Sequence, residues 1–394
     1  MSSSVASQET RGNAEAPVSL VQINLQSHFG GGEVYTAFLC RALSRLGVPT
    51  RLLVHPQAGF WDRLELPADT ERIAVADPSR LQRHLPAGPL WLLSHGPLPV
   101  ELRADAPGRL RTAIAHMPVQ GRDPGVFAGH QCIYAVSAWV RDGLRAAGLP
   151  AWDEPLYGVA ELGQRPTGDV IRRRSRYAWD RRKARDRLLG WLEPLAERLR
   201  PHPHFVRRDG LTLGIVSRLT PIKQFPLLFA QLAPLLACHR QVRLEIFGSG
   251  GYASVRDLDQ VLAALPAGQV RFWGQQGNVA GIYRQLDYLL CGLPEKEALG
   301  LNIIEAQACG TPVLAVNAPP FCETVVHGET GFLYRDPRQD GGADFGQLLE
   351  QLLAGRARPH PELAQEHLAR FSFDAFVERL RPVVAAARDQ LSRA

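Results

Sequence analysis

The chain has 394 residues, more than a single hydrophobic core usually holds, so two domains are expected. Hydrophobic residues make up 45% of the chain and charged residues 21%, which indicates an ordinary soluble globular protein, and no run approaches the roughly eighteen apolar residues that span a bilayer. The net charge of +6 favours acidic partners without choosing between phosphate ligands, anionic lipid and nucleic acid.

The first part of the chain alternates between strand and helix patterns. Residues 1–17 lack the basic start and apolar core of a signal peptide, so we expect a disordered polar tail there. Apolar residues then recur at helical spacing from Val34 to Leu46, and Gly47 would end that helix. Strands are predicted on either side of the helix and further along the chain, at 18–25, 51–54, 91–94, 112–116 and 132–137.

A glycine loop, HFGGGE at residues 28–33, precedes the first helix. Gly30, Gly31 and Gly32 would let the backbone approach a ligand closely beside a helix N-terminus, although a turn needed only for tight packing is the alternative. A dinucleotide-binding fingerprint would need another glycine where Tyr35 stands, so an NAD site is disfavoured.

A second alternating series follows and predicts a second domain of the same class. Its strands are predicted at 211–217, 242–248, 270–274, 288–293 and 313–316, and its helices at 225–237, 254–265 and 301–308. Such alternation is typical of parallel sheets covered by helices, so the fold class is α/β with two Rossmann-like domains.

A strongly basic segment lies between the two series. Residues 172–187, RRRSRYAWDRRKARDR, carry nine basic residues and two acids, with Tyr177 and Trp179 among them. We expect a helical insertion that either lies against an anionic membrane or a phosphorylated acceptor, or is simply a solvated helix.

Two glutamates stand out near the end of the second series, in EKEALGLNIIEAQACGTPVLA. Glu297 falls in the loop before the predicted helix 301–308, and Glu305 lies inside that helix among apolar neighbours, where an idle carboxylate is hard to place. The free N–H groups and positive dipole of the helix start suit a phosphate. Arg218 and Lys223 follow the first strand of this domain, at the edge where parallel sheets bind ligands, and their charges suit a diphosphate.

Other candidate residues carry less information. His116 ends a strand of the first domain, so it could bond a substrate or move a proton, or could be a satisfied core histidine; His28 is a weaker candidate. Asp257 and Asp259 spell D-x-D, but a helical pattern surrounds them and predicts a solvated face. No cluster with credible metal-ligand spacing is found.

The cysteines show no paired spacing, and several lie in apolar segments. We expect free, buried thiols in a reducing cytoplasm, without a zinc site or a disulfide framework. They are Cys40, Cys132, Cys238, Cys291, Cys309 and Cys322.

Taken together, these motifs resemble the retaining glycosyltransferases of family 4, which have the GT-B fold. The resemblance covers nearly everything from Val18 to the C-terminus and is most specific at residues 297–315. It is carried by GGGE, SRLTPIK, IFGSGG, VRFWG, EALGLNIIEAQACGTPVLA and VVHGETGFL.

The resemblance implies roles for these residues. Arg218 and Lys223 match the family's cations that hold the donor diphosphate. Glu305 matches the glutamate that binds the nucleotide ribose, and Glu297 matches the glutamate near the donor sugar. His116 matches a histidine that lies near the same sugar. The implied catalytic residues are His116, Arg218, Lys223 and Glu297. The implied donor-binding residues are Gly31, Gly32, Arg218, Lys223, Gly248, Gly274, Glu297, Ala298, Leu299, Gly300, Leu301, Asn302 and Glu305.

The family needs neither metal nor cofactor, because cations and a helix dipole stabilise the departing nucleoside diphosphate, and the nucleotide sugar is itself a substrate. Three departures from its pattern are visible. Leu299 stands where an aromatic residue is usual, Gln224 follows Lys223 where glycine is common, and YGVA at 157–160 replaces an N-G-V-D-like turn.

These observations predict the following organisation and function. We expect a tail at 1–17, an acceptor-side domain at 18–165, a basic helical linker at 166–205, a nucleotide-sugar domain at 206–370, and a C-terminal helix at 371–394 that packs back on the first domain. The expected activity moves a sugar from a UDP- or GDP-sugar to a glycan or lipid-linked acceptor in envelope polysaccharide or lipopolysaccharide synthesis. It would take place in the cytoplasm or at the inner face of the membrane, without nucleic acid. A GT-B epimerase or phosphorylase and a noncatalytic membrane- or polyanion-binding protein are the alternatives.

Overall fold

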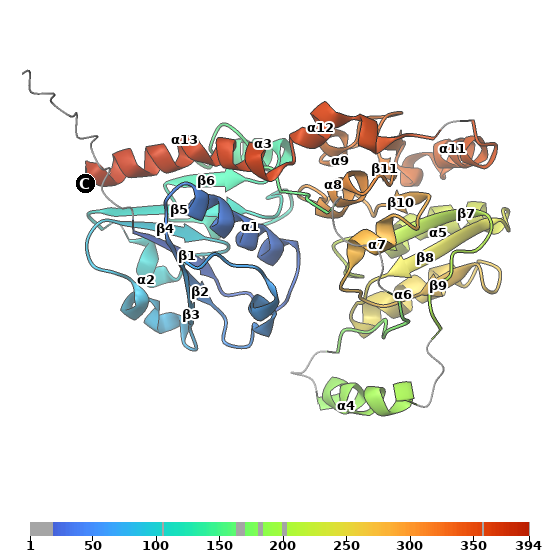
Figure 1. Ribbon diagram of the computed structural model, residues 1–394, viewed down its shortest axis with the longest axis horizontal. Coiled ribbons are helices and arrows are strands. Elements are labelled where there is room, and N and C mark those ends of the chain that lie inside the picture. The colour runs from blue at the N-terminus through green and yellow to red at the C-terminus, as the bar shows by residue number, and fades with distance from the viewer. Residues whose placement is uncertain are drawn as a thin grey trace, which may run out of the picture.

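The computed structural model describes residues 19–104, 106–162, 170–179, 184–198, 203–356 and 358–393. The predicted tail at 1–17 and part of the predicted linker lie outside these ranges. Figure 1 shows two α/β bodies side by side, with the last helix lying along the first of them. None of the helices formed by the described residues is long and apolar enough to cross a membrane.

Each body is built on a parallel sheet of six strands. The strand orders are β3-β2-β1-β4-β5-β6 and β12-β11-β10-β7-β8-β9, and every pairing is parallel. The prediction of two parallel α/β domains is confirmed. The first sheet contains β1 (Leu20–Asn24), β2 (Thr50–Val54), β3 (Thr70–Ala74), β4 (Leu90–Ser94), β5 (Arg109–Ala115) and β6 (Cys132–Ala135). The second contains β7 (Leu211–Val216), β8 (Val242–Phe247), β9 (Val270–Phe272), β10 (Tyr288–Leu290), β11 (Val313–Val316) and β12 (Gly331–Tyr334).

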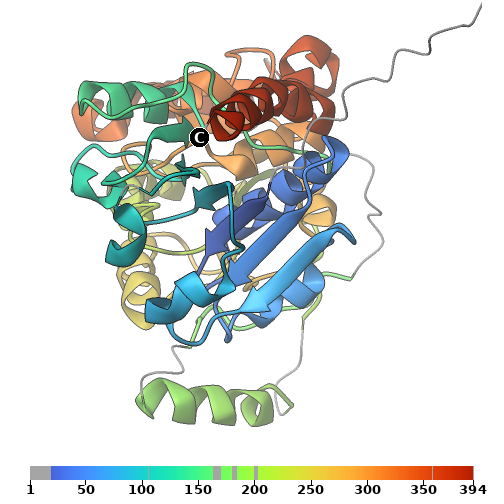
Figure 2. The same cartoon turned by 90° about the vertical axis from the view of Figure 1, so that its left-hand side faces the viewer.

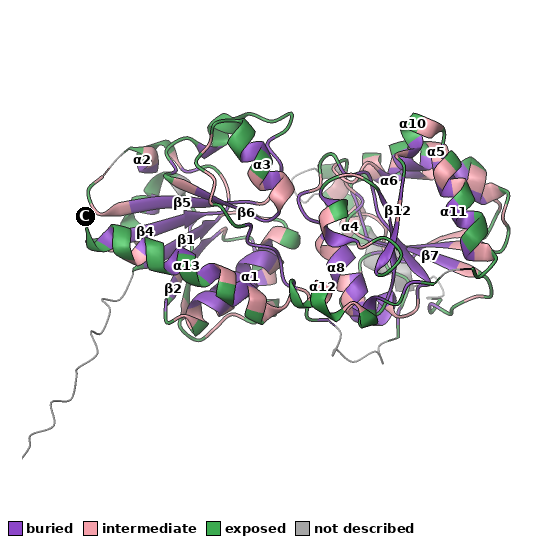
Figure 3. Ribbon diagram, turned by 90° about the horizontal axis from the view of Figure 1, so that it is seen from above, coloured by how far each residue is buried: buried purple, intermediate pink, exposed green. Residues whose placement is uncertain are grey.

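The inner strands are apolar because helices cover both faces of each sheet. Every residue of β1 and β4 is buried, and Figure 3 shows the strands as the buried layer within an exposed helical shell. The polar strand β3, which the sequence did not predict, is an edge strand whose side chains are mostly exposed. It therefore lacks the apolar run by which the inner strands are recognised.

The helices follow the order expected for alternating α/β units. They are α1 (Gly31–Arg45), α2 (Val100–Arg103), α3 (Ala138–Ala146), α4 (Ala184–Arg198), α5 (Phe225–Ala237), α6 (Tyr252–Leu262), α7 (Val279–Tyr283), α8 (Leu301–Ala308), α9 (Phe321–Thr324), α10 (Pro337–Asp340), α11 (Ala343–Leu353), α12 (Gln365–Ala369) and α13 (Phe373–Ser392). Short 3-10 turns occur at Gly59–Arg63, Pro78–His84, Pro124–Phe127 and Pro361–Leu363.

The chain returns to the first domain at its end. Helix α13 packs against α1, β4 and β5, and its buried residues Phe376, Val377, Leu380, Val383 and Val384 recur at helical spacing. The backbone of the first domain meets the start of this helix, since the Ala160 N–H donates to Phe371 O at 3.0 Å.

The basic segment is only partly helical. Residues 171–178 lie along the second domain in extended form, with backbone hydrogen bonds from Arg174 N to Trp273 O (2.9 Å) and from Ala178 N to Gly250 O (2.8 Å). Our expectation of a helix there is wrong, because the turns after β8 and β9 supply these backbone partners. Among the residues of this segment that the structure describes, α4 is the only helix. It lies at the periphery, away from both sheets, in the two views of Figures 1 and 2.

Candidate functional site

The second domain places two candidate charges in contact at the carboxyl edge of its sheet. The ammonium of Lys223 forms an ion pair with Oε2 of Glu297, and both side chains are largely buried. The other carboxylate oxygen of Glu297 accepts from the backbone N–H of Ala298 at 3.2 Å. Lys223 and Glu297 come from different loops, so the sheet edge brings them together as the sequence predicted.

Helix α8 starts beside these charges. Gly300 precedes it with φ of 85°, a left-handed conformation that glycine adopts without strain, so the helix can begin abruptly at Leu301. The side chain of Asn302 donates to Val216 O at 3.3 Å and ties this helix start to the end of β7, which Arg218 follows. The first N–H groups of the helix have no partners within it and therefore favour an anion.

Glu305 lies on α8, where it is partly buried. Its Oε2 accepts from the hydroxyl of Tyr283 at 3.0 Å. Burial, together with the Glu305 carboxylate, holds the pKa of Tyr283 well above its usual value, so the hydroxyl remains a donor. The carboxylate is thus oriented by a buried side chain.

The glycine loop of the first domain faces this edge. A β-carbon on Gly30 would lie 2.8 Å from Nη2 of Arg218, one on Gly31 3.2 Å from Cδ1 of Leu301, and one on Gly32 4.0 Å from Nδ1 of His116. The guanidinium of Arg218 therefore lies against the loop of the other domain. The absence of side chains at Gly30 and Gly31 is what permits this approach.

His116 is paired with a histidine that the sequence reading missed. Its Nε2 lies 2.8 Å from Nδ1 of His95, and the two ring planes are only 17° apart, so the rings meet edge to edge through these nitrogens. Burial lowers the pKa of His116 to about 4, and burial together with the neighbouring His116 holds the pKa of His95 well below its usual value, so both are neutral near pH 7. His95 follows β4, and the strand-end argument applied to His116 would have found it.

Glu33 is a second residue that the sequence reading passed over. It is buried in the first turn of α1, and burial raises its pKa, although hydrogen bonds to the backbone of Glu33 and Gly30, the positive charge of Arg218 and a bond from Asn24 oppose the shift. An acid at the third position of a helix is a known signal for bonds to the helix start. Glu33 therefore braces the glycine loop.

Two of the departures from the family pattern meet at the domain interface. Ala298 and Leu299 are buried in the core cluster of the first domain. A β-carbon at Gly158, in the YGVA turn, would lie 2.3 Å from Cδ2 of Leu301 and 3.3 Å from Cδ2 of Leu299. Leu299 thus packs between the domains at the glycine of that turn.

The third departure, Gln224, adopts the backbone conformation that glycine favours. It has φ of 52°, and it is the sole residue other than glycine with positive φ in the part of the chain that the structure describes. Its Oε1 is buried and has no hydrogen-bond partner there.

At two of the predicted donor-binding glycines, neighbouring backbone atoms leave no room for a side chain. A β-carbon at Gly248 would lie 1.8 Å from Ser217 O, and one at Gly274 2.4 Å from Ser175 O. Gly248 thus packs beside the loop that carries Arg218, whereas the close contacts of Gly274 are with the backbone of residues 174 and 175 in the inserted segment.

The weaker candidates do not join the site. Asp257 and Asp259 lie on α6, as predicted, and form ion pairs with Arg256 and Arg176. His28 is exposed and bonded to Ser27. No group of three or more histidine, cysteine or carboxylate side chains could hold a metal among the residues that the structure describes.

The cysteine prediction is wrong in part. Cys40, Cys291 and Cys309 are buried and Cys132 is partly buried, but Cys238 and Cys322 are exposed. All six are free thiols in the structure.

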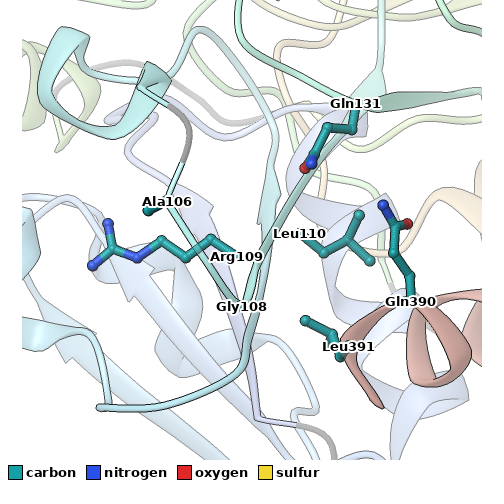
Figure 4. A pocket seen from close by; sticks show the side chains of 7 residues that line it. All are labelled: Ala106, Gly108, Arg109, Leu110, Gln131, Gln390 and Leu391. Atoms are coloured by element: carbon teal, nitrogen blue, oxygen red, sulfur yellow. The ribbon is translucent and has the colours of Figure 1, made fainter. Parts of the chain in front are cut away.

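Two cavities lie outside the contacts described above. One, of about 160 Å³, lies between the start of β5 and the end of α13 (Figure 4). It is at the amino ends of the strands, opposite the edge where parallel sheets bind ligands. The other, of about 190 Å³, adjoins the cation loop and is lined in part by Thr220, Gln224 and Lys296.

The comparisons with known proteins agree with this architecture. Residues 210–355 match the model of the family described as "Glycosyl transferases group 1". The chain is 27% identical to a D-inositol 3-phosphate glycosyltransferase of Thermobispora bispora, covering 92% of this chain and 91% of that protein.

Solved structures with low sequence identity share the fold. Sucrose-phosphate synthase from Thermosynechococcus elongatus has a TM-score of 0.68 at 17% identity, covering 96% of this chain and all of that one. Anabaena Alr3699/HepE in complex with UDP and glucose has a TM-score of 0.64 at 16% identity, covering 94% of this chain and all of that one. Residues 210–355 thus match the group 1 glycosyltransferases, the whole chain is similar in sequence to a glycosyltransferase, and the fold it shares with the solved structures confirms the predicted GT-B class.

Proposed function

We propose that this enzyme moves a hexosyl group from a UDP- or GDP-sugar to an acceptor hydroxyl, with the donor diphosphate held between Arg218, Lys223 and the start of α8. The observation that carries this proposal is the contact of Arg218 with Gly30 across the domain interface. Arg218, the ion-paired Lys223 and the start of α8 all belong to the second domain and lie at one edge of its sheet, and the contact brings the glycine loop of the first domain against them. These groups together suit two phosphates.

Each charged residue then has a separate task. Arg218 and Lys223 neutralise charge that grows on the diphosphate as it leaves, and an ammonium with three donors can bond phosphate while it keeps Glu297. Glu305, oriented by Tyr283, holds the ribose hydroxyls. Glu297 orients the hydroxyls of the sugar.

Retention follows if the acceptor attacks the face from which the diphosphate leaves. The bond from the anomeric carbon to the phosphate oxygen breaks, the bond to the acceptor oxygen forms on the same face, and the acceptor proton passes to a donor phosphate oxygen. His116 is neutral near pH 7, because its pKa is about 4, so it serves as a hydrogen-bonding group to the sugar and not as an acid.

The acceptor is a finer proposal. The relative in Thermobispora bispora is named for D-inositol 3-phosphate, which favours a phosphorylated polyol as the acceptor class here. A glycan or lipid-linked acceptor of envelope polysaccharide or lipopolysaccharide synthesis is the second candidate, and the basic segment at 172–187 favours it.

Ligand-dependent melting tests the donor site. UDP, GDP and their common sugar derivatives are added singly, and the donor nucleotide should raise Tm because it binds only the native state. Arg218→Ala and Lys223→Ala should lose that shift, whereas Arg240→Ala, an exposed arginine of the same domain, should keep it. If both site variants keep the shift, the diphosphate site is elsewhere.

Product analysis tests the transfer itself. Donor consumption is measured with inositol phosphates, with glycan and lipid-linked acceptors, and without acceptor, and NMR of the product reports the anomeric configuration. A transferase requires an acceptor and retains the configuration. Epimerisation of the nucleotide sugar without acceptor, or phosphorolysis with inorganic phosphate, would instead support an epimerase or a phosphorylase.

A peripheral membrane contact is proposed for the inserted segment. On α4, Leu188 and Trp191 are 58% and 75% exposed, three residues apart on one face, and Arg172 and Arg173 are exposed nearby in the sequence. Each well-placed cation contributes about 1 kcal/mol near an anionic bilayer. Sedimentation with phosphatidylserine vesicles at low salt should capture the wild type and lose Trp191→Ser. If the wild-type protein stays in the supernatant, the proposed membrane contact is wrong.

A further inference from the structure

A chain of buried polar groups lies behind His116. Gln22 of β1, His95 after β4 and His116 after β5 come from three adjacent strands of the first sheet. His95 Nε2 lies 3.0 Å from Oε1 of Gln22, and His95 Nδ1 lies 2.8 Å from Nε2 of His116. Gln22 is fully buried, and its Nε2 donates to Sγ of Cys40 at 3.3 Å. These contacts fix which ring nitrogens carry hydrogen.

The protons follow from counting donors and acceptors. The Gln22 oxygen can only accept, so His95 must carry its hydrogen on Nε2. Since burial keeps His95 neutral, its Nδ1 is then an acceptor. The nearby Thr36 hydroxyl, 3.3 Å away, cannot satisfy this nitrogen, because it donates its one hydrogen to Gly32 O at 2.8 Å. The hydrogen that Nδ1 of His95 receives is therefore the Nε2 hydrogen of His116.

The tautomer of His116 decides whether its other ring nitrogen donates or accepts a hydrogen bond. With hydrogen on Nε2, its Nδ1 carries a lone pair and has no partner among the described residues. A β-carbon on Gly32 would lie 4.0 Å from this nitrogen, in the glycine loop that Arg218 contacts from the other domain. A ligand group at this place must donate a hydrogen bond, as a sugar hydroxyl can.

We propose that Gln22 and His95 are positioning residues that hold His116 as the Nε2–H tautomer, so that its Nδ1 accepts a hydrogen bond from a hydroxyl of the donor sugar. The inference rests on the proposed placement of the sugar beside His116. The tautomer adds a requirement on the sugar that does not follow from its placement beside His116 alone. The sugar must present a donor at this point, and a deoxy or O-methyl derivative there should bind like the bare nucleotide.

NMR of the wild-type enzyme tests the tautomer directly. Protein labelled with 15N in the histidine rings should show His116 protonated on Nε2 alone at pH 7, with the signal assigned by its loss in His116→Ala. A signal from Nδ1–H, or from a doubly protonated ring, would overturn the proposal. Because no variant is needed for the observation itself, it does not depend on how His95 variants fold.

Kinetics test whether the tautomer matters. His95→Leu removes the acceptor, so kcat/KM for the donor should fall by about tenfold, as for loss of one hydrogen bond. His95→Asn places an amide oxygen near the position of Nδ1 and should restore most of this loss. Binding of UDP without a sugar should be unchanged in both variants.

A double-mutant cycle separates positioning from general damage. In a His116→Ala background, His95→Leu should have no further effect on kcat/KM, because it acts through His116. If the losses in kcat/KM are additive, the positioning role of His95 is contradicted, while the placement of His116 beside the sugar stands. If His116→Ala alone keeps wild-type kinetics, the placement of the sugar in the proposed function is wrong, and this inference falls with it.

Discussion

The roles proposed for the charged residues of the site differ in how each interaction changes between ground state and transition state. Glu305 should hold a ribose whose charge does not change, so Glu305→Gln should raise the KM for the donor with a smaller effect on kcat. Arg218 and Lys223 should face charge that grows, so removing either should lower kcat by roughly a hundredfold to a thousandfold, about 3 to 4 kcal/mol.

The effect of substituting Glu297 on kcat and KM should lie between the effects expected for Glu305 and for the two cations. It would orient the sugar while positive charge develops at the anomeric carbon, so Glu297→Gln should reduce kcat more than it raises KM. Steady-state kinetics at saturating donor measure all four variants, with melting curves as the folding control. Near wild-type kcat in both Arg218→Ala and Lys223→Ala would contradict the proposed diphosphate site.

Gln224 stores backbone strain beside Lys223. A residue with a β-carbon in the left-handed region costs roughly 1 kcal/mol, and the buried Oε1 of Gln224 adds an unpaired polar atom. Gln224→Gly should therefore raise the free energy of unfolding by about 1 kcal/mol in urea titrations. The matched control, Gln224→Ala, keeps the β-carbon and should not gain the conformational part. Equal stability of the two variants would show that φ is not the cause.

At the scale of elements, a carboxylate of the second domain caps a helix of the first. Glu323 on α9 accepts from the backbone N–H groups of Ala138 (2.8 Å) and Trp139 (2.7 Å) in the first turn of α3, and from the hydroxyl of Tyr157 (3.2 Å). An acid at a helix N-terminus satisfies free donors and interacts favourably with the helix dipole. The contact therefore holds the two domains at their present spacing.

Loss of this contact should loosen the domain arrangement. Glu323→Ala should destabilise the contact by about 1 to 2 kcal/mol, as for loss of a helix cap, and should increase the radius of gyration measured by small-angle X-ray scattering without ligand. Glu329→Ala removes an exposed acid nearby in the sequence and should change neither quantity. Unchanged scattering for Glu323→Ala would show that other interdomain contacts suffice.

At the scale of the whole molecule, buried neutral histidines make stability depend on pH. Burial lowers the pKa values of His95, His116, His130 and His367 below 6.5. The unfolded chain therefore binds protons before the folded one does, so stability is fully present above about pH 6.5 and is lost as the pH falls toward the folded pKa values.

Urea titrations from pH 8 to pH 4.5 should show this loss. For His116, whose pKa falls from 6.5 to about 4, the contribution is at most about 3 kcal/mol. His116→Gln should flatten the pH dependence, whereas His204→Gln, at an exposed position, should leave it unchanged. A wild-type stability that is flat or rises as the pH falls through this window would contradict the assignment.

Local pattern predicted some parts of the site and missed others for physical reasons. Arg218, Lys223 and His116 were identifiable because each follows an apolar strand, and strand ends meet at one edge. His95 also follows a strand, but its importance depends on its contacts with Gln22 and His116, which lie 73 and 21 positions away. The helix expected at 171–178 was wrong because backbone partners from turns of the second domain outweigh local preference.

By itself, the sequence determined the alternation of strands and helices, the α/β class and the residues at the carboxyl ends of the strands. These follow from hydrophobic periodicity and from glycine and proline signals, which act over a few residues and are strong where a segment is buried. Helix α5, predicted at 225–237, spans Phe225–Ala237 in the structure.

Only the tertiary structure decided how the two domains complete the site. The approach of Arg218 to Gly30, the cap that Glu323 supplies to α3 and the packing of Leu299 against Gly158 all join residues from different domains. Such contacts depend on the shapes of two finished surfaces and on the burial they achieve together. No local pattern in one segment encodes them, because the partner lies more than a hundred residues away in the chain.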